Sequence, residues 1–151
     1  MMNEELKKQL RNRRICVVIP TYNNDKTIKT VVEKCLLYCD DVIVVTDGCT
    51  DRTTDILHAI DGITIVSYPQ NRGKGYALKM GFRRALEMGF SYAITLDGDG
   101  QHYPEDIPLF LKANQQHPQS LIIGSRQLEG VDRSKGSSFA NKFSNFWFYV
   151  Q

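Results

Sequence analysis

The 151-residue sequence has no apolar run close to the roughly 20 residues that cross a bilayer. This absence excludes a transmembrane helix of ordinary length within these residues. Its start, MMNEELKKQLRNRR, lacks the apolar core of a secretory signal peptide. The sequence also has no internal repeat or low-complexity segment. We therefore expect a soluble, cytoplasmic chain.

Cysteine and net charge are also low. The four cysteines, at positions 16, 35, 39 and 49, form no CxxC pair, so we expect reduced thiols rather than disulfides or a zinc site. The net charge of +2 is too small to support nucleic-acid binding. Residues 1–14 form a basic N-terminal arm. We expect this arm to be a solvated, frayed terminus, with contact to an anionic surface as the alternative.

What the sequence does contain is a regular alternation of apolar strands and helical patterns. The apolar runs lie at 15–20, 42–45, 63–66, 92–96 and 121–124. Continuous apolar strands between helices predict an α/β fold with a mostly parallel sheet and helices on both faces. Ligands bind beyond the carboxyl ends of such strands. The polar motifs TYNND (21–25), TDGCTD (46–51) and DGDGQH (97–102) each begin at a strand end, so we expect them to converge there.

The segment DGDGQH has the strongest chemical signal. Asp97 and Asp99 leave a strand through glycines and can both direct oxygens at one Mg²⁺ or Mn²⁺ ion. Such an ion keeps open positions for substrate phosphates, and Gln101 could add a neutral oxygen. The alternative is an Asp-Gly turn without function. His102 lies beside this segment, with a role on the ligand side or a structural hydrogen bond.

Two further segments could contact a phosphorylated ligand. Asp47, at the end of the second strand, could accept hydrogen bonds from a base or ribose, or it could cap a turn. The turn NRGKG (71–75) could offer backbone N–H groups and Lys74 to a phosphate, or it could be a tight structural turn. Asp51 is best explained as a helix cap or a first-turn acid.

Aromatic residues are concentrated near the end of the sequence, with six of the fifteen between positions 139 and 149. We expect a helix over 136–151 that has Phe139, Phe143, Phe146 and Val150 on one face. This face could pack on the sheet, or it could meet a further segment or a membrane surface. We expect the chain to be the first part of a longer protein.

Five segments together resemble the N-terminal, nucleotide-sugar-binding part of family 2 glycosyltransferases of the GT-A (Rossmann-like) fold. The similarity is to the dolichol-phosphate mannosyltransferase-like, polyprenyl-phosphate glycosyltransferase branch. The segments are VVIPTYNN (17–24), VVTDGCTDRT (44–53), NRGKGYALKMGF (71–82), LDGDGQHYPEDIP (96–108) and IIGSR (122–126), in family order. The resemblance implies a nucleotide-sugar-binding domain over 15–135, followed at 136–151 by the start of an acceptor-side helix.

The resemblance also implies roles for individual residues. Those implied to line the nucleotide site are Pro20, Tyr22, Asn24, Asp47, Lys74 and Gly98. Asp97, Asp99 and Gln101 are implied to hold Mg²⁺ or Mn²⁺ on the diphosphate. Arg126 and Arg133 are implied to face the phosphate of a lipid acceptor, and the catalytic set is Asp97, Asp99 and Arg126.

The function implied by the resemblance is inverting transfer of a sugar from a UDP- or GDP-linked donor to a polyprenyl phosphate. The full-length protein is then expected at the cytoplasmic face of a membrane, in cell-envelope biogenesis. A transferase that extends a polysaccharide or lipid-linked glycan at a hydroxyl is one alternative, and a non-catalytic nucleotide-binding module is another. A hydroxyl acceptor needs a general base, and the sequence shows no clear candidate. This absence favours a phosphate acceptor, with a base in a further part of the protein as the alternative. This chain alone is expected to bind donor and metal, whereas its transfer of sugar to polyprenyl phosphate is expected to be very weak or absent.

Overall fold

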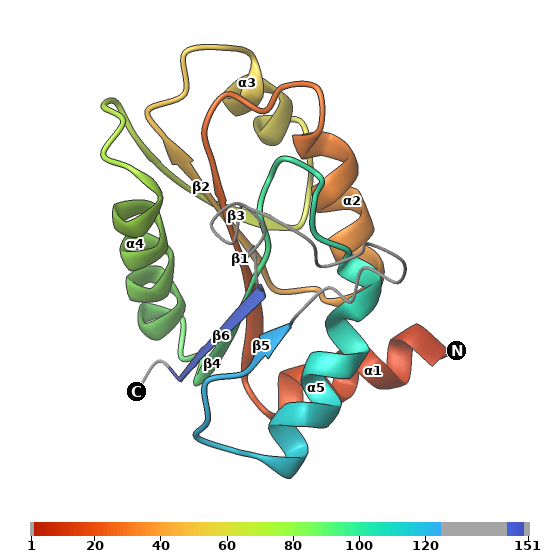
Figure 1. Cartoon of the computed structure of the whole chain (residues 1–151). Coiled ribbons are helices and arrows are strands. Elements are labelled where there is room, and N and C mark those ends of the chain that lie inside the picture. The colour runs from red at the N-terminus through yellow and green to blue at the C-terminus, as the bar shows by residue number, and fades with distance from the viewer. Residues whose placement is uncertain (1, 125–144, 150–151) are drawn as a thin grey trace, which may run out of the picture.

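A central sheet organises the computed structural model, which describes residues 2–124 and 145–149 (Figure 1). The strands are β1 (Ile15–Thr21), β2 (Val42–Asp47), β3 (Ile63–Tyr68), β4 (Tyr92–Thr95), β5 (Ile123–Gly124) and β6 (Asn145–Tyr149). The helices are α1 (Met2–Asn12), α2 (Ile28–Tyr38), α3 (Thr53–His58), α4 (Lys74–Glu87) and α5 (Ile107–Gln116), and a 3₁₀ turn, η1 (Pro104–Asp106), precedes α5.

The strand order is β3-β2-β1-β4-β6-β5. The first four neighbours run parallel, whereas β6 is antiparallel to both β4 and β5. The predicted mostly parallel α/β sheet is therefore confirmed. The apolar runs that became β1, β2 and β4 suit these places because the middle of a parallel sheet covered on both faces offers buried positions on either side. All seven residues of β1 and all six of β2 are buried.

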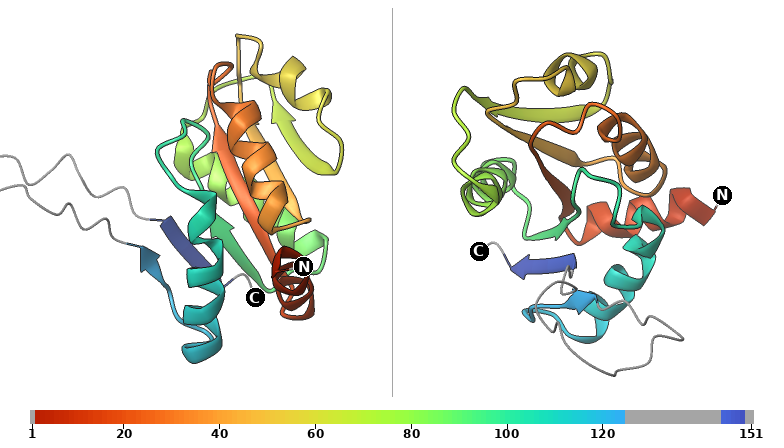
Figure 2. Two further views of the ribbon diagram at one scale, coloured as in Figure 1. Left: turned by 90° about the vertical axis from the view of Figure 1, so that its right-hand side faces the viewer. Right: turned by 45° about the horizontal axis from the view of Figure 1, so that its top comes forward.

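Helices cover both faces of the sheet, as predicted (Figures 1 and 2). Val17 and Ile19 point to the face covered by α1, α2, α3 and α5, whereas Cys16 and Val18 point to the face covered by α4. Helix α4 packs closely, because a Cβ at Gly81 would lie 2.4 Å from Cγ1 of Val18. The absence of a side chain at Gly81 therefore lets the backbone of α4 approach the strands.

The expectation of a frayed N-terminal arm is wrong, because residues 2–12 form helix α1. Leu10 is 1% exposed and belongs to the main core, with Leu6 packed against it one turn away. Asp40 pairs with Lys7, whose Nζ lies 2.8 Å from Oδ1, and also with Arg11. The basic residues are thus the polar side of an amphipathic helix whose apolar side is buried.

The predicted aromatic helix is also wrong over residues 145–149, which form strand β6. Its register pairs Tyr149 with Tyr92 and Trp147 with Ile94. Aromatic residues favour strands, and the free edge of β4 supplies the hydrogen-bonding partner that a sequence pattern does not reveal. Residues 136–144 and 150–151 lie outside the described residues.

All four cysteines are free in the structure, and their reduced state stays a prediction. Burial raises the pKa of Cys39 to about 12 and also raises the pKa of Cys16 and of Cys35. These three thiols therefore stay protonated at neutral pH.

In residues 2–124 and 145–149 no helix combines the length and the apolar character that crossing a membrane requires.

Candidate active site

The carboxyl ends of β1, β2 and β4 and the start of α4 surround one cavity of about 260 Å³. Its lining consists of Pro20, Thr21, Tyr22, Asn24, Asp47, Lys74, Asp97, Gly98 and Asp99. The three polar motifs therefore converge as the strand pattern predicts, because parallel strands deliver their ends to a common crevice. Eight of these nine residues were singled out in the sequence, and Thr21 is the addition.

Asp47 ends β2 and is 3% exposed. One of its carboxylate oxygens accepts a hydrogen bond from the backbone N–H of Arg72 at 2.7 Å, and the other accepts one from that of Gly73 at 2.9 Å. Gly48 lets this loop come close, because a Cβ at its φ of +65° would lie 2.3 Å from the nitrogen of Asn71. The carboxylate thus holds the loop that leads into α4, which fits the turn-capping interpretation of Asp47.

Three residues beside Asp47 were not identified from the sequence. The rings of Tyr68 and Tyr76 meet edge to face, with centroids 5.3 Å apart, and the guanidinium of Arg72 lies 3.9 Å from the centroid of Tyr76. Burial and the neighbouring Asp47 carboxylate raise the pKa of the Tyr68 phenol. No periodicity marks this cluster, because its members come from β3, the loop after it and α4.

Asp97 is held by contacts from two directions. Its Oδ1 lies 2.6 Å from Nζ of Lys74, the first residue of α4. The backbone N–H of Asp97 donates to Nδ1 of His102 at 2.9 Å, so this ring nitrogen is the acceptor. Nε2 of His102 lies 3.8 Å from Oδ2 of Asp97. His102 is 6% exposed, and its position shows the structural hydrogen bond that the sequence left open.

The rest of the Asp97–Gln101 loop is also fixed by the fold. The hydroxyl of Thr27 donates to the carbonyl of Gly98 at 2.8 Å, and a Cβ at Gly98 would lie 2.7 Å from Oγ1 of Thr21. Oδ1 of Asp99 accepts from the backbone N–H of Gln101 at 2.9 Å. The two carboxylates therefore line the cavity from a loop that these hydrogen bonds hold.

The loops after β1 and β2 are joined by side chains. Oδ1 of Asn23 accepts from the backbone N–H of Thr50 at 2.8 Å, and the backbone N–H of Asn24 donates to the hydroxyl of Thr53 at 2.9 Å. Oδ1 of Asp51 accepts from the N–H of Thr53, the first residue of α3, at 2.9 Å. Asp51 therefore acts at the helix start, as predicted.

The donor set suits a hard divalent cation that is shared with a ligand. Asp97 and Asp99 both line the cavity, whereas Gln101 is exposed and outside the lining. Among residues 2–124 and 145–149, no three His, Cys, Asp or Glu side chains gather as a metal-binding group. Two carboxylates leave most positions of Mg²⁺ or Mn²⁺ open for phosphate oxygens and water. The residues present thus fit such an ion together with a diphosphate.

Some predicted site residues cannot be placed. Arg126 and Arg133 lie outside the described residues, so their relation to the cavity stays a prediction.

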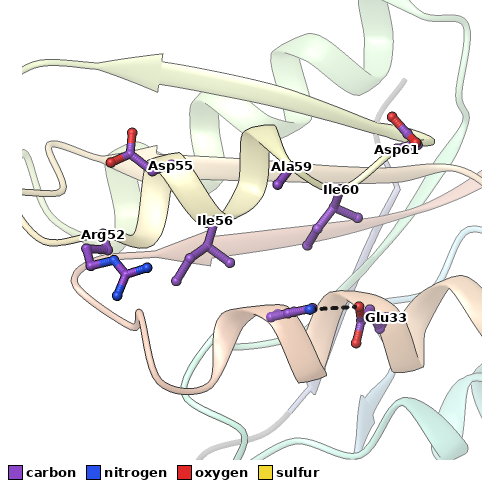
Figure 3. Close-up of a pocket in the computed structure, with 8 residues that line it drawn as sticks. Glu33, Arg52, Asp55, Ile56, Ala59, Ile60 and Asp61 are labelled. Atoms are coloured by element: carbon purple, nitrogen blue, oxygen red, sulfur yellow. Dashed lines mark ion pairs between the residues drawn. The ribbon is translucent and has the colours of Figure 1, made fainter.

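A larger cavity of about 450 Å³ lies between α2 and α3 (Figure 3). Its lining comes from α2, α3 and the residues that flank α3, such as Glu33, Arg52 and Asp55, rather than from strand ends. Volume alone therefore does not mark the site, and strand-end geometry favours the smaller cavity.

Solved structures with this arrangement are GT-A glycosyltransferases. Glucosyl-3-phosphoglycerate synthase from Mycobacterium tuberculosis, in complex with Mn²⁺ and UDP-glucose, matches with a TM-score of 0.61 and 26% identity. The match covers 79% of this chain and 45% of that one. The complex with Mn²⁺, UDP and phosphoglyceric acid matches with a TM-score of 0.60 and 25% identity, over 79% of this chain and 45% of that one.

This chain belongs to glycosyl transferase family 2, whose model matches residues 16–148. A dolichyl-phosphate N-acetylglucosaminyltransferase of Methanococcus voltae that uses UDP-N-acetylglucosamine is 31% identical over 129 residues, 74% of this chain and 51% of the relative. The undecaprenyl-phosphate mannosyltransferase of Micrococcus luteus is 32% identical over 123 residues, 78% of this chain and 50% of the relative. The chain therefore spans about half the length of these curated relatives.

Proposed function

We propose that this chain binds a nucleotide-diphosphate sugar and takes part in inverting transfer of the sugar to a polyprenyl phosphate. The observation that supports this proposal best is the joint placement of Asp97, Asp99 and Lys74 around one cavity at the carboxyl ends of β1, β2 and β4. The relatives that are named for transfer to dolichyl and undecaprenyl phosphate support the acceptor class.

In this proposal the cavity holds the donor. Pro20, Tyr22, Asn24 and Gly98 contact the nucleoside and sugar, and the loop that Asp47 anchors lies along the nucleotide. Lys74 faces the diphosphate. Asp97 and Asp99, with Gln101 beside them, bind Mg²⁺ or Mn²⁺. When bound, the ion neutralises negative charge on the departing nucleoside diphosphate.

The acceptor needs little activation in this proposal. A polyprenyl phosphate is largely ionised at neutral pH, so its oxygen can attack the anomeric carbon without a general base. The new C–O bond forms on the face opposite the diphosphate as the old C–O bond breaks, which inverts the configuration. Arg126 and Arg133 bind the lipid phosphate, and the full-length protein meets this acceptor at the cytoplasmic face of a membrane.

A transfer assay with the full-length protein tests the proposal. Labelled UDP- and GDP-sugars are offered with polyprenyl phosphate in one arm and with a glycan hydroxyl acceptor in the other. We expect lipid-linked product in the first arm, with Mg²⁺ or Mn²⁺ required, and loss of product in Asp99→Asn. Asp55→Asn, in the cavity between α2 and α3, is the matched control and retains activity. Product only in the glycan arm would overturn the acceptor assignment, and no transfer in either arm would favour a binding module.

A further inference from the structure

The ion pair between Lys74 and Asp97 occupies a position where a divalent cation would meet its first carboxylate. Nζ of Lys74 lies 2.6 Å from Oδ1 of Asp97. The Asp97 side chain is 14% exposed, whereas that of Lys74 is 48% exposed. The carboxylate is thus sheltered from water while its ammonium partner reaches it from the open side.

A cation that binds Asp97 in this arrangement must approach an ammonium group. Like charges a few ångströms apart repel strongly in a partly buried site, where water screens them poorly. The other oxygen of Asp97 faces His102, 3.8 Å from Nε2. The binding of a metal ion to Asp97 Oδ1 therefore requires Lys74 to move.

The structure allows that movement without a change in the backbone. Lys74 begins α4, and the loop before it is fixed by the bonds from Arg72 and Gly73 to Asp47. A lysine places one compact charge on a flexible four-carbon stem, so its ammonium can change partners while the Cα stays in place. Both Lys74 and Asp97 line the cavity that the donor diphosphate is proposed to occupy.

We propose that Lys74 is the resident counter-ion of Asp97 in the ligand-free protein, and that a nucleotide diphosphate draws it away as the divalent cation binds. This inference rests on the proposed function for the identity of the diphosphate. It makes metal and nucleotide binding mutually dependent: the ion alone meets an occupied carboxylate, whereas the diphosphate gives Lys74 a second anionic partner.

Titration of Mn²⁺ into this chain without nucleotide, followed by the electron paramagnetic resonance signal of free Mn²⁺, tests the proposal. Lys74→Met should bind Mn²⁺ at least about fivefold more tightly than the wild type, the lower end of usual coupling between two ligands. The factor by which UDP or GDP improves Mn²⁺ affinity should shrink in the same variant. Lys74→Arg, which keeps the charge, should resemble the wild type.

Two controls separate this effect from a general change in charge. Lys26→Met removes one positive charge from a neighbouring pocket, which it lines together with Thr27 and Thr30, and should leave Mn²⁺ affinity within about twofold of the wild type, short of that coupling range. Asp97→Asn should remove the gain that Lys74→Met produces. Thermal unfolding of each variant verifies that it is folded.

The outcomes distinguish this inference from the proposed function. Tighter Mn²⁺ binding by Lys74→Met in a protein that binds no nucleotide would keep the counter-ion role and overturn the proposed function. Joint binding of Mn²⁺ and nucleotide with unchanged or weaker Mn²⁺ binding by Lys74→Met would overturn the counter-ion role and keep the proposed function. An equal gain in Lys26→Met would also overturn it.

Discussion

The cavity at the strand ends and the cavity between α2 and α3 differ in the way that their charged side chains are used. In the larger one, between α2 and α3, Lys29 and Glu33 sit one helical turn apart on α2 and pair with each other at 3.8 Å, with both side chains more than half exposed (Figure 3). In the smaller one, Asp47, Lys74 and Asp97 come from three different elements, and buried or half-buried contacts fix them. This difference supports the proposal that the chemistry takes place where the strand ends converge rather than in the cavity of larger volume.

The largest expected effect comes from Asp99→Asn in the smaller cavity. In the wild type, Mn²⁺ with UDP or GDP at about 100 times the dissociation constant should raise Tm by roughly 5–10 °C, more than either does alone. Asp99→Asn should abolish that synergy because a neutral amide is a poor ligand for a hard cation. Thermal scans of the wild type and Asp99→Asn, with metal, nucleotide and both together, measure this shift in Tm. Asp55→Asn is the control from the larger cavity. A full metal-dependent shift in Asp99→Asn would leave DGDGQ as a turn without metal chemistry.

Removal of His102 should produce the next largest effect. His102→Ala deletes the acceptor for the Asp97 N–H and should cost about 1–3 kcal/mol of unfolding free energy. The amide oxygen of His102→Asn can stand where Nδ1 stands, so this variant should recover much of the loss, whereas His102→Gln should recover less. Urea unfolding measures the three variants. If His102→Asn and His102→Gln lost the same free energy of unfolding, the volume of the ring, rather than the Nδ1 acceptor, would account for the stability that His102 provides.

Asp51 should contribute a smaller, pH-dependent amount to the free energy of unfolding. Burial opposes ionisation, but hydrogen bonds from Thr53 and Asp25 outweigh it and lower the pKa of Asp51 below 3.8. A lowered folded-state pKa stabilises the protein above the unfolded pKa of about 4, and the contribution is lost as pH falls. Asp51→Asn should therefore lower the free energy of unfolding by less than about 1 kcal/mol at pH 7 and by progressively less towards pH 3. Urea unfolding of both proteins across this pH range measures the difference. A loss that grows at low pH would contradict this.

The smallest effect is expected in the larger cavity. Glu33→Gln breaks the exposed pair with Lys29 and should change the free energy of unfolding by no more than about 0.5 kcal/mol. Donor and metal binding should stay at the wild-type level. Denaturant titration measures the free energy of unfolding, and titration with Mn²⁺ in the presence of UDP or GDP measures the binding. If Glu33→Gln weakened nucleotide binding, the contrast between the two cavities would be wrong.

Sequence patterns predicted the features that depend on strand order along the chain. Apolar runs followed by polar motifs were enough to bring Asp47, Asp97 and Asp99 to one edge, because parallel strands share an end. The same patterns could not predict that β6 pairs with β4, since a free edge is a property of the assembled sheet. They also could not show that Lys74 meets Asp97 or that Asp47 is bonded to the Arg72–Gly73 backbone, because these contacts depend on the placement of α4.

The register of β1 and β4 has a consequence for the order in which the molecule folds. Ile15 pairs with Tyr92 and Val18 with Thr95, so this parallel pair joins parts of the chain that are far apart in sequence. Closing so long a loop costs more conformational entropy than forming local structure, and non-local parallel pairing is slow for this reason. Asp97 and Asp99 come shortly after β4, so we expect them to reach the cavity only after that strand has docked. We therefore expect the proposed affinity for a divalent cation to develop late in folding, and to report completion of the sheet rather than collapse of the chain.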